Sequence, residues 1–434
     1  AVVARDLSKM YHEVNELNET LEQKVITRTE ELNKTLEEVR RLKLHQDGDY
    51  FLTSLLLKPL NTNYVKSDRL TVEFLQRQKK KFDFKGKPHD LGGDLCSAHT
   101  IRIRDREYTA FMNADAMGKS MQGAGGALVL GAVFYSIIER TRSVAAMQRL
   151  SPERWLKNTF LELHKVFESF DGSMLISLVL GIIDNNTGLL YYINAEHPWS
   201  ILYRDGSATF IEQELYVRKL GMTAASGTIY IRILELKPGD MLICGSDGRD
   251  DILLPSPDGK TRMNESEDLI LDTVKNAKGD LERIYETTQS LGEITDDFSL
   301  LKIKYYGDTM PEAEKLAKRS ASGRHYKAKN YAKAIAEGEA YLGNKPSDTE
   351  FMRFLSRCHR LAGNYEIAID LCERLRLRLP DDTRNLINLA GLHLVRGDTE
   401  RARSLIAEIR QLDPAAPALK KLEDVYRRKQ KAAA

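Results

Sequence analysis

Apolar positions near the N-terminus follow a regular helical spacing. Through residue 47 they recur at alternating intervals of three and four, which is the seam of a coiled coil. The seam residues are Leu7, Met10, Val14, Leu17, Leu21, Val25, Leu32, Leu36, Val39 and Leu42. The interval of four from Leu21 to Val25 is a stutter, and the polar seam residues Arg28 and Thr35 weaken the coil further. A helix of about 65 Å is too long to pack on one small domain. The pattern therefore predicts a parallel homodimeric coiled coil over residues 1–47.

The middle of the chain, residues 48–305, combines short apolar runs with turn signals. The apolar runs are 177–183, 189–193, 200–203, 229–236, 241–244 and 298–303. Turn sequences such as Arg204-Asp205-Gly206 separate them, which is typical of antiparallel hairpins. Helical patterns occur at about 124–145, 152–169 and 264–290. Strands in runs, with helices grouped apart from them, predict an α+β layered domain large enough to bury its own core.

The C-terminal segment, residues 321–434, has an internal period of 34 residues. The residues that keep this period are Pro346, Pro380 and Pro414, together with Ala334, Ala368 and Ala402. A helical repeat of this length resembles the tetratricopeptide repeat. We therefore expect an all-α array of three repeats, joined to the middle domain by a linker at 306–320. Such an array either binds a protein or peptide partner or packs on the neighbouring domain and caps it.

Composition is that of a globular protein with several domains. The chain has 434 residues, of which 42% are hydrophobic, and this length predicts two to four domains. It has no run of about 18 apolar residues, so we expect no membrane span. The four cysteines are Cys96, Cys244, Cys358 and Cys372. Because they are far apart and form no CxxC pair, they predict free thiols and a cytoplasmic location rather than a zinc site or disulfides.

The net charge of +2 is an average over three different segments. Residues 1–47 have 8 basic and 10 acidic side chains, residues 48–320 have 35 and 38, and residues 321–434 have 22 and 15. The basic excess of the repeats favours an acidic protein partner, and helical repeats of this kind give little support for nucleic-acid binding.

Four acidic motifs in the middle segment carry the candidate chemistry. They are Leu91-Gly92-Gly93-Asp94, Asn113-Ala114-Asp115-Ala116-Met117-Gly118-Lys119, Cys244-Gly245-Ser246-Asp247-Gly248 and Thr295-Asp296-Asp297-Phe298-Ser299. A single Asp-Gly is usually a turn. However, Asp247 follows one apolar run and Asp296 precedes another, so both lie at strand ends. Carboxylates gathered at strand ends beside glycines suit hard cations with oxygen ligands, which favours Mg²⁺ or Mn²⁺ over Zn²⁺.

The order of these motifs, with Asn194-Ala195-Glu196-His197-Pro198 between the second and third, resembles a known family. It is similar to the SpoIIE-like branch of the PPM (type 2C) metal-dependent serine/threonine phosphatases, over about residues 50–305. The resemblance implies an antiparallel β-sandwich flanked by helices, with two Mn²⁺ or Mg²⁺ ions at one end. It also implies that a water bridging the two metals attacks phosphorus, so that no protein nucleophile is needed.

The resemblance also implies which residues bind the metals. The implied ligands, catalytic through the metal-bound water, are Asp94, Asp115, Ala116 through its carbonyl, Asp247 and Asp296. Asp115 would bridge both ions, Asp94 would hold one of them, and Asp247 with Asp296 would hold the other.

Several residues beside these ligands have supporting or ambiguous roles. We expect Asp297 and Gly248 to support the ligands without binding metal themselves. His197 is either a general acid for the leaving serine or a structural loop residue. Arg249 either contacts phosphate or forms a surface ion pair with Asp250.

The N-terminal phrase from Leu21 to Leu32 resembles the signalling helix that joins bacterial sensor domains to output domains. The chain starts inside this helix, so it is either a fragment of a longer polypeptide or a piece cut at an arbitrary boundary. The resemblance implies an upstream sensor, and if that sensor lies in the membrane, the chain is the cytoplasmic part of a membrane-bound sensor protein. Residues 48–62 resemble the regulatory switch segment of the family, and a plain core helix is the alternative. We hypothesise that the coil sets this segment and thereby completes or empties a metal site.

Together these observations predict a bacterial signalling phosphatase that hydrolyses phosphoserine or phosphothreonine on a partner protein. The resemblance implies an anti-sigma-factor antagonist of the STAS fold as one such substrate. The alternative is a catalytically degenerate phosphatase fold that serves as a scaffold through its repeats. Retention of all four motif aspartates argues against that alternative.

Overall fold

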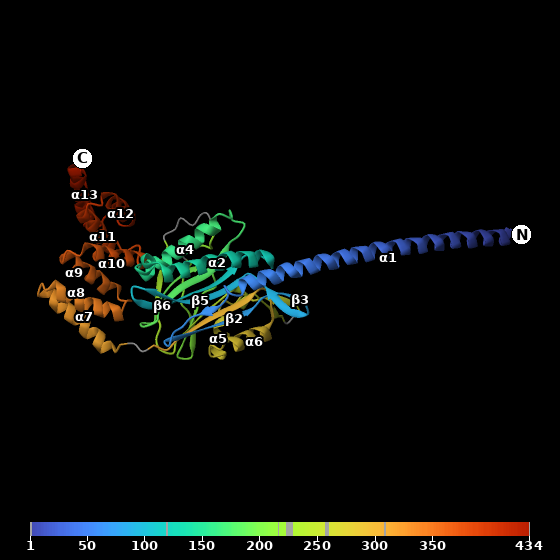
Figure 1. Ribbon diagram of the computed structural model, residues 1–434, viewed down its shortest axis with the longest axis horizontal. Coiled ribbons are helices and arrows are strands. Elements are labelled where there is room, and N and C mark those ends of the chain that lie inside the picture. Colours follow the sequence, from blue (N-terminus) through green and yellow to red (C-terminus); the bar gives the residue numbers. More distant parts are fainter. Residues whose placement is uncertain are drawn as a thin grey trace.

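The computed structural model describes residues 2–118, 120–215, 217–222, 229–256, 260–307 and 310–433, without the side chains of 2–8, 13 and 431–433. Lys119 of the second acidic motif and the side chain of Leu7 in the coil seam therefore lie outside the described residues. Figure 1 shows a long N-terminal helix, a central domain of sheets and helices, and a C-terminal array of helices.

Helix α1 runs without a break from Val2 to Leu57 and extends away from the central domain over most of its length (Figure 1). Its 56 residues correspond to about 84 Å. The predicted seam is exposed along this helix, with Val25 62% and Leu32 65% accessible. The helix continues past residue 47, so the backbone does not separate the predicted coil from the first part of the predicted switch segment.

The central domain consists of two large sheets packed face to face. Among the described residues, the first sheet has the order β1-β5-β6-β7-β8-β11 and the second has the order β10-β9-β12-β16-β2. The strands of the first sheet are β1 (Asn63–Tyr64), β5 (Asp94–Ile103), β6 (Arg106–Ala116), β7 (Ile176–Asp184), β8 (Leu189–Ala195) and β11 (Arg232–Glu235). Those of the second sheet are β2 (Leu70–Arg77), β9 (Ile201–Arg204), β10 (Ser207–Phe210), β12 (Met241–Gly245) and β16 (Phe298–Tyr305).

The predicted antiparallel sandwich needs one correction, because β1 pairs with β5 in parallel. Every other pair within the two large sheets is antiparallel in the part of the chain that the structure describes. Smaller elements complete the sheet structure. They are β3 (Lys80–Phe84), β4 (Lys87–Leu91), η1 (Asp247–Arg249), β13 (Ile252–Pro255), β14 (Thr261–Met263) and β15 (Glu293–Ile294).

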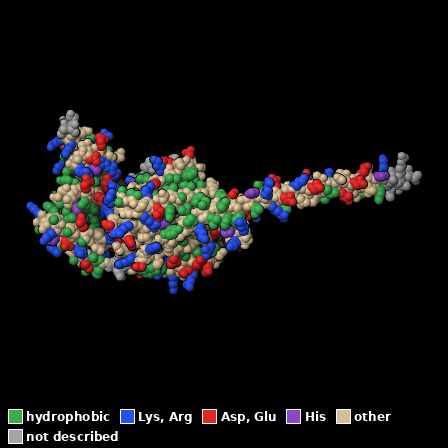
Figure 2. Space-filling view, in the orientation of Figure 1, with side chains coloured by type: hydrophobic (Ala, Val, Ile, Leu, Met, Phe, Trp, Pro, Cys, Tyr) green, Lys and Arg blue, Asp and Glu red, His purple; other side chains and the backbone are tan. Residues whose placement is uncertain are grey.

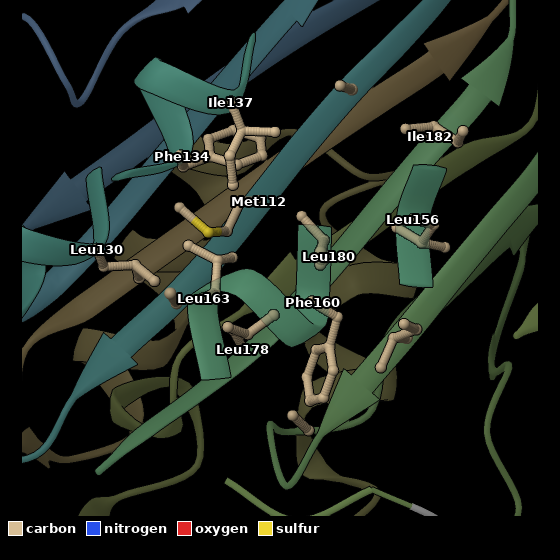
Figure 3. Packing of buried hydrophobic residues seen from close by; sticks show 14 of the residues in the cluster. Met112, Leu130, Phe134, Ile137, Leu156, Phe160, Leu163, Leu178, Leu180 and Ile182 are labelled. Carbon is tan, nitrogen blue, oxygen red and sulfur yellow. The ribbon is translucent and has the colours of Figure 1, made fainter. Parts of the chain in front are cut away.

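Helices cover the outer faces of the sandwich. They are α2 (Met121–Ser143), α3 (Ala145–Gln148), α4 (Pro152–Glu168), α5 (Leu269–Asn276) and α6 (Leu281–Leu291). Figure 3 shows Phe134 of α2 and Phe160 of α4 packed over Met112 of β6 and Leu180 of β7. The sandwich and its helices confirm the predicted α+β class, and the predicted helical segment 264–290 proves to be two helices.

Helix α2 is, among the described residues, the one helix that is long and apolar enough to cross a membrane by composition. Half of that stretch is buried inside the fold, and its apolar side chains pack on the first sheet. The small residues Gly123, Ala124, Gly126 and Ala127 allow this close packing.

The C-terminal array consists of helices paired in antiparallel fashion. Their bounds are α7 (Glu312–Lys327), α8 (Tyr331–Asn344), α9 (Thr349–Leu361), α10 (Tyr365–Arg378), α11 (Thr383–Arg396), α12 (Thr399–Leu412) and α13 (Leu419–Ala433). The three alanines of the 34-residue period are fully buried where the helices meet. In addition, α8, α10 and α12 each end two residues before a proline of that period.

The array begins earlier than the sequence predicts. Helix α7 starts at Glu312, so the interval 306–320 is not a linker throughout. Glu312 and Glu314 occupy the first turn, where acidic side chains favour a helix, and Pro311 precedes it. Ser322 is buried and donates a hydrogen bond to the Ala334 carbonyl of α8 at 2.6 Å, which joins α7 to the first helical pair.

The array packs directly on the central domain through a buried ion cluster. Glu153 of α4 is fully buried and bonds Arg378 and Arg374 of α10, with 3.1 Å between Arg374 Nε and Glu153 Oε2. Burial alone would raise the pKa of Glu153, but the two guanidinium charges lower it to about 2. Arg104 adds a bidentate pair to Asp370 at 2.8 and 2.9 Å. Of the two predicted roles of the repeats, packing on the neighbouring domain is therefore observed.

Candidate metal centre

Asp94 and Asp115 face each other across the β5–β6 hairpin. They are directly opposed in the antiparallel register, near the beginning of one strand and the end of the next. Asp94 is 3% exposed, and its Oδ2 accepts a hydrogen bond from the Ser246 hydroxyl at 2.6 Å. The sequence motifs around these two residues are thus brought together by strand pairing.

Three further carboxylates gather beside this pair. One oxygen each of Asp247, Asp251 and Asp296 lies within 4.8 Å of the others. Asp247 opens the short helix η1, and the Asp251 amide donates to the Asp247 carbonyl at 2.8 Å, so this turn places both side chains together. Asp296 arrives from the loop before β16. Asp251 was not predicted as a site residue.

Glycines make the close approach of these loops possible. A Cβ atom at Gly93 would lie 2.5 Å from the Ala116 carbonyl oxygen, and one at Gly248 would lie 2.0 Å from the Asp297 carbonyl oxygen. At Gly92 a Cβ atom would lie 2.2 Å from Asp297 Oδ2. These contacts explain the glycines of the Gly-Gly-Asp and Ser-Asp-Gly motifs. They also place the Ala116 carbonyl against the Gly-Gly-Asp turn.

Asp297 holds the loops around the site rather than joining the three gathered carboxylates. Its Oδ2 accepts from the Gly93 amide at 2.8 Å and its Oδ1 accepts from the Lys79 amide at 2.7 Å. Gln78 also donates to the Asp94 carbonyl at 3.1 Å. The position of Asp297 agrees with the supporting role expected of it. Neither Gln78, which bonds Asp94, nor Lys79, which bonds Asp297, was predicted as part of this arrangement.

The carboxylates repel one another in the absence of a cation. Burial and then the charges of Asp115, Asp251 and Asp296 raise the pKa of Asp247 to about 7. Burial, followed by the charges of Asp296 and Asp297, raises the pKa of Asp115 to about 6. The pKa of Asp94 is raised well above its ordinary value, chiefly by burial and then by Asp115. Carboxylates gathered in this way need a positive charge to remain ionised at neutral pH.

The donor set fits divalent cations. Asp94 Oδ1 is buried and accepts no hydrogen bond from the described residues, although a buried carboxylate oxygen normally has a partner. All candidate ligands are oxygens, which suits Mg²⁺ or Mn²⁺ better than zinc. Asp94, Asp115, Asp247, Asp251 and Asp296 are therefore the residues that could hold such ions.

His197 lies in a buried chain of hydrogen bonds. Its Nε2 is 2.9 Å from Asn113 Oδ1 and its Nδ1 is 3.0 Å from Ser177 Oγ. Burial, with the nearby charge of Arg249, lowers the pKa of His197 to about 3. With both ring nitrogens bonded and the ring neutral, the geometry agrees with a structural loop residue and not with a general acid.

Arg249 is buried rather than on the surface. Its Nε lies 3.0 Å from Asp250 Oδ2, so the predicted ion pair exists, and its Nη2 donates to the Trp199 carbonyl at 2.7 Å. This side chain therefore ties the loop after β12 to the loop after β8.

An open cleft of about 590 Å³ begins at Asp247 and Asp251. Its described walls come from the loop after β8, the segment after β10, the loop after η1 and the loop before α5. Lys219 lines this cleft, and its positive charge lowers the pKa values of both Asp115 and Asp247. Sequence reasoning missed Lys219, because no motif surrounds it.

Residues 105–306 match the family model described as Stage II sporulation protein E (SpoIIE). The paired sheets, with five carboxylates at one end, agree with the PPM-type phosphatase fold that this match indicates. Residues 362–424 match a tetratricopeptide repeat model. Both predicted resemblances are confirmed over these ranges. Asp94 lies before the matched range, so its place in the site rests on its register opposite Asp115.

Solved structures of similar proteins are distant in sequence. The RsbU and RsbW domains of a Mycobacterium tuberculosis protein are 17% identical, covering 63% of this chain and 73% of that chain with a TM-score of 0.41. The phosphatase domain with a regulatory fragment of SpoIIE from Bacillus subtilis is 17% identical, covering 55% and 64%, with a TM-score of 0.40. The SiaA-PP2C domain of Pseudomonas aeruginosa is also 17% identical, covering 60% and 95%, with a TM-score of 0.40. No curated protein matches the chain.

Proposed function

We propose that this chain is a metal-dependent protein phosphatase that hydrolyses phosphoserine or phosphothreonine on a partner protein. The observation that carries the proposal is the convergence of four aspartates from four separate motifs, together with Asp251, at one end of the sandwich. Aspartates so gathered raise one another's pKa values, an arrangement that divalent cations relieve.

The residues of the chain have separable tasks in this proposal. Asp94, Asp115, Asp247, Asp251 and Asp296 would hold two Mn²⁺ or Mg²⁺ ions. When bound, such ions would supply Lewis-acid chemistry, which lowers the pKa of water and neutralises the charge of phosphoryl oxygens.

Neighbouring side chains position these groups. The Ser246 hydroxyl fixes the orientation of Asp94, and Asp297 fixes the Gly-Gly-Asp turn through two backbone amides. Lys219 offers a cation at the start of the cleft, where it would attract the phosphate of an incoming substrate.

Hydrolysis of p-nitrophenyl phosphate tests this proposal. We expect activity that requires Mn²⁺ or Mg²⁺ and falls by about 100-fold or more in Asp247→Asn, because metal ions stabilise the transition state by several kcal/mol. Asp424→Asn is the matched control, since Asp424 is exposed in helix α13, outside the domain that carries the motifs. Metal-independent rates, or equal rates in Asp247→Asn and wild type, would favour the degenerate scaffold instead.

We further propose that the N-terminal helix regulates the site. Tyr50 and Phe51 near the end of α1 pack on the β3–β4 hairpin, with Phe51 stacked on Phe84 at 4.6 Å. Strand β4 ends at Leu91, immediately before the Gly-Gly-Asp turn that carries Asp94. A rotation of α1 would therefore move the β3–β4 hairpin and, through it, the turn that carries Asp94.

A homodimeric coil is part of the same proposal. The seam of α1 has no partner among the described residues, and Figure 2 shows apolar and charged side chains interspersed along the projecting helix. The seam continues through Leu52, Leu55 and Leu56, which are 60%, 49% and 57% exposed. A second copy of α1 would cover these side chains. We place the protein in the cytoplasm, as the output part of a sensor.

The tetratricopeptide array is proposed to bind an acidic segment of a partner protein. Helices α9, α11 and α13 border a groove of about 540 Å³ with an apolar floor that includes Ile387 and Leu422. The charged residues lining this groove are Arg360, Arg384, Lys421 and Lys429. None of the four has an ion pair within the described residues, whereas arginines elsewhere in the array pair with acidic groups. Separately from this partner, we propose an anti-sigma-factor antagonist of the STAS fold as a substrate of the phosphatase site.

A further inference from the structure

The cleft beside the metal centre has two features that the chemistry of phosphate hydrolysis does not require. One is an apolar wall formed by Trp199, Phe210 and Leu215. The rings of Trp199 and Phe210 meet edge to face, with centroids 5.6 Å apart, so this part of the wall is preformed. Leu215 is 49% exposed on the same wall, where it is available to a ligand.

The other feature is an acidic rim on the loop before α5. Glu265 and Glu267 line the cleft, are exposed, and have no ion pair within the described residues. The remaining rim acids differ from them, because Glu196 pairs with Arg218 and Asp250 pairs with Arg249. Two glutamates at this rim are therefore available to a ligand.

Hydrogen bonds hold this rim next to the loop that carries Asp251. Asn264 donates to the Asp250 carbonyl at 3.1 Å, and its own side chain accepts from the Ser266 amide at 3.0 Å. Glu265 directly follows Asn264, whose side chain is bonded to Asp250, the residue before Asp251. An extended peptide advances about 3.3–3.6 Å per residue, so a side chain two or three residues from a phosphoserine lies about 7–11 Å along the chain from it. The cleft that holds Asp247 and Asp251 also includes this loop in its wall.

We propose that the cleft selects a phosphorylated segment with a Lys or Arg two or three residues from the phosphorylated residue and an apolar side chain beside it. The basic side chain binds Glu265 and Glu267, and the apolar one packs on the wall that includes Leu215. Opposite charges on the cleft and the segment steer the encounter as well as stabilise it. This inference rests on the proposed phosphatase activity and names the substrate that the same site prefers.

Kinetics on matched phosphoserine peptides test the inference. Two peptides of equal length place either Arg or Glu two and three residues after the phosphoserine, with Leu beside it in both. We expect the full-length protein with Mn²⁺ to show a kcat/KM at least about tenfold higher for the Arg peptide. In Glu265→Lys/Glu267→Lys this ratio should fall to about one or invert, since the rim then repels the basic side chains.

Two controls separate this test from other outcomes. The double variant Glu168→Lys/Glu286→Lys makes the same charge change on exposed helical residues outside the cleft, and it should keep the wild-type ratio. A ratio near one in the wild-type protein, or an unchanged ratio in the rim variant, would overturn the inference while p-nitrophenyl phosphate hydrolysis still supported the phosphatase. Loss of metal-dependent hydrolysis of both peptides and of p-nitrophenyl phosphate would refute the proposed function and this inference with it.

A change in the apolar wall gives an independent readout. Leu215→Asp should raise KM for the peptide with Leu beside the phosphoserine several-fold more than for a peptide with Gly there. Equal effects on both peptides would show that the wall does not contact the substrate and would contradict that half of the inference.

Discussion

Replacing Asp247 with Asn should stabilise the metal-free protein while it removes metal-dependent catalysis. Burial and the charges of Asp115, Asp251 and Asp296 raise the pKa of Asp247 from 3.8 to about 7. The folded protein therefore binds this proton more tightly than the unfolded chain does. The resulting contribution to stability is fully present below about pH 3.8 and is lost as the pH rises through about 7.

The size of this effect follows from the pKa interval. An interval from 3.8 to about 7 corresponds to about 4 kcal/mol between the two ionisation states. Because Asp247 borders an open cleft, solvent screening reduces this figure to about 2 kcal/mol. A neutral Asn avoids that cost, so at pH 8 the free energy of unfolding should rise by about 2 kcal/mol. This corresponds to an increase in Tm of about 4–8 °C for a domain of this size.

Thermal unfolding in EDTA between pH 5 and pH 8 measures this difference. The advantage of Asp247→Asn should be greatest at pH 8 and shrink towards pH 5, where the wild-type carboxyl is protonated. Adding Mn²⁺ should reverse the order, because the ion stabilises only a folded protein that can bind it. Asp424→Asn should match the wild type throughout. A lower or equal Tm for metal-free Asp247→Asn at pH 8 would refute the reasoning from carboxylate repulsion.

Three further predictions concern the parts around this site. Inserting seven residues within 20–40 of α1 keeps the seam in register and should leave phosphatase activity within about twofold of the wild type. Inserting four residues shifts the register and should change the activity several-fold. Equal rates in the two variants would contradict regulation of the site by the coil. Lys421→Glu should weaken binding of an acidic amphipathic peptide about tenfold by fluorescence anisotropy, while Lys420→Glu, next to it but outside the groove, should not. Glu153→Gln removes the buried charge between two arginines and should destabilise docking of the repeats by about 3 kcal/mol, seen as faster hydrogen exchange in α10. Because the pKa of Glu153 is lowered to about 2, docking of the wild-type repeats should be complete above about pH 4.5 and be lost as the pH falls towards 2. Unchanged hydrogen exchange in Glu153→Gln would show that the ion cluster does not hold the domains together.

Local sequence patterns predicted the strands that consist of apolar residues. They did not predict the strands that bury polar side chains. The apolar runs that became β7, β8, β9, β12 and β16 were recognisable because turn residues bound them. Strands β5 and β6 were not predicted as strands, although they carry two of the candidate ligands. They contain buried polar residues such as Asn113, whose side chain bonds Ser299 and His197 from distant parts of the chain. No local signal shows that such residues are satisfied inside a core.

The residues of the candidate site also divide into those that a local motif predicted and one that no motif predicted. Asp94, Asp115, Asp247 and Asp296 were found because each lies in a recognisable motif. Asp251 was missed, because an Asp pair after an arginine reads as exposed surface. Only the turn at η1 brings it beside Asp247.

The linker was misjudged for a related reason. Residues 308 and 309 lie outside the described chain, but from Glu312 onward the helix α7 is already packed on α8 through Ser322. The first helix of a repeat array lacks a preceding repeat, so the 34-residue period does not show where it begins.

Phosphate release from a phosphoserine peptide, measured in Mn²⁺ for the wild type and for Asp115→Asn, tests the central claim most directly. Asp115 lies opposite Asp94, and its charge acts on Asp247 as well. Loss of this carboxylate should therefore weaken metal binding by the whole cluster of aspartates. The account predicts that release requires the metal, stops in EDTA, and falls by about 100-fold or more in the variant. Undiminished release in EDTA, or a variant as active as the wild type, would contradict it.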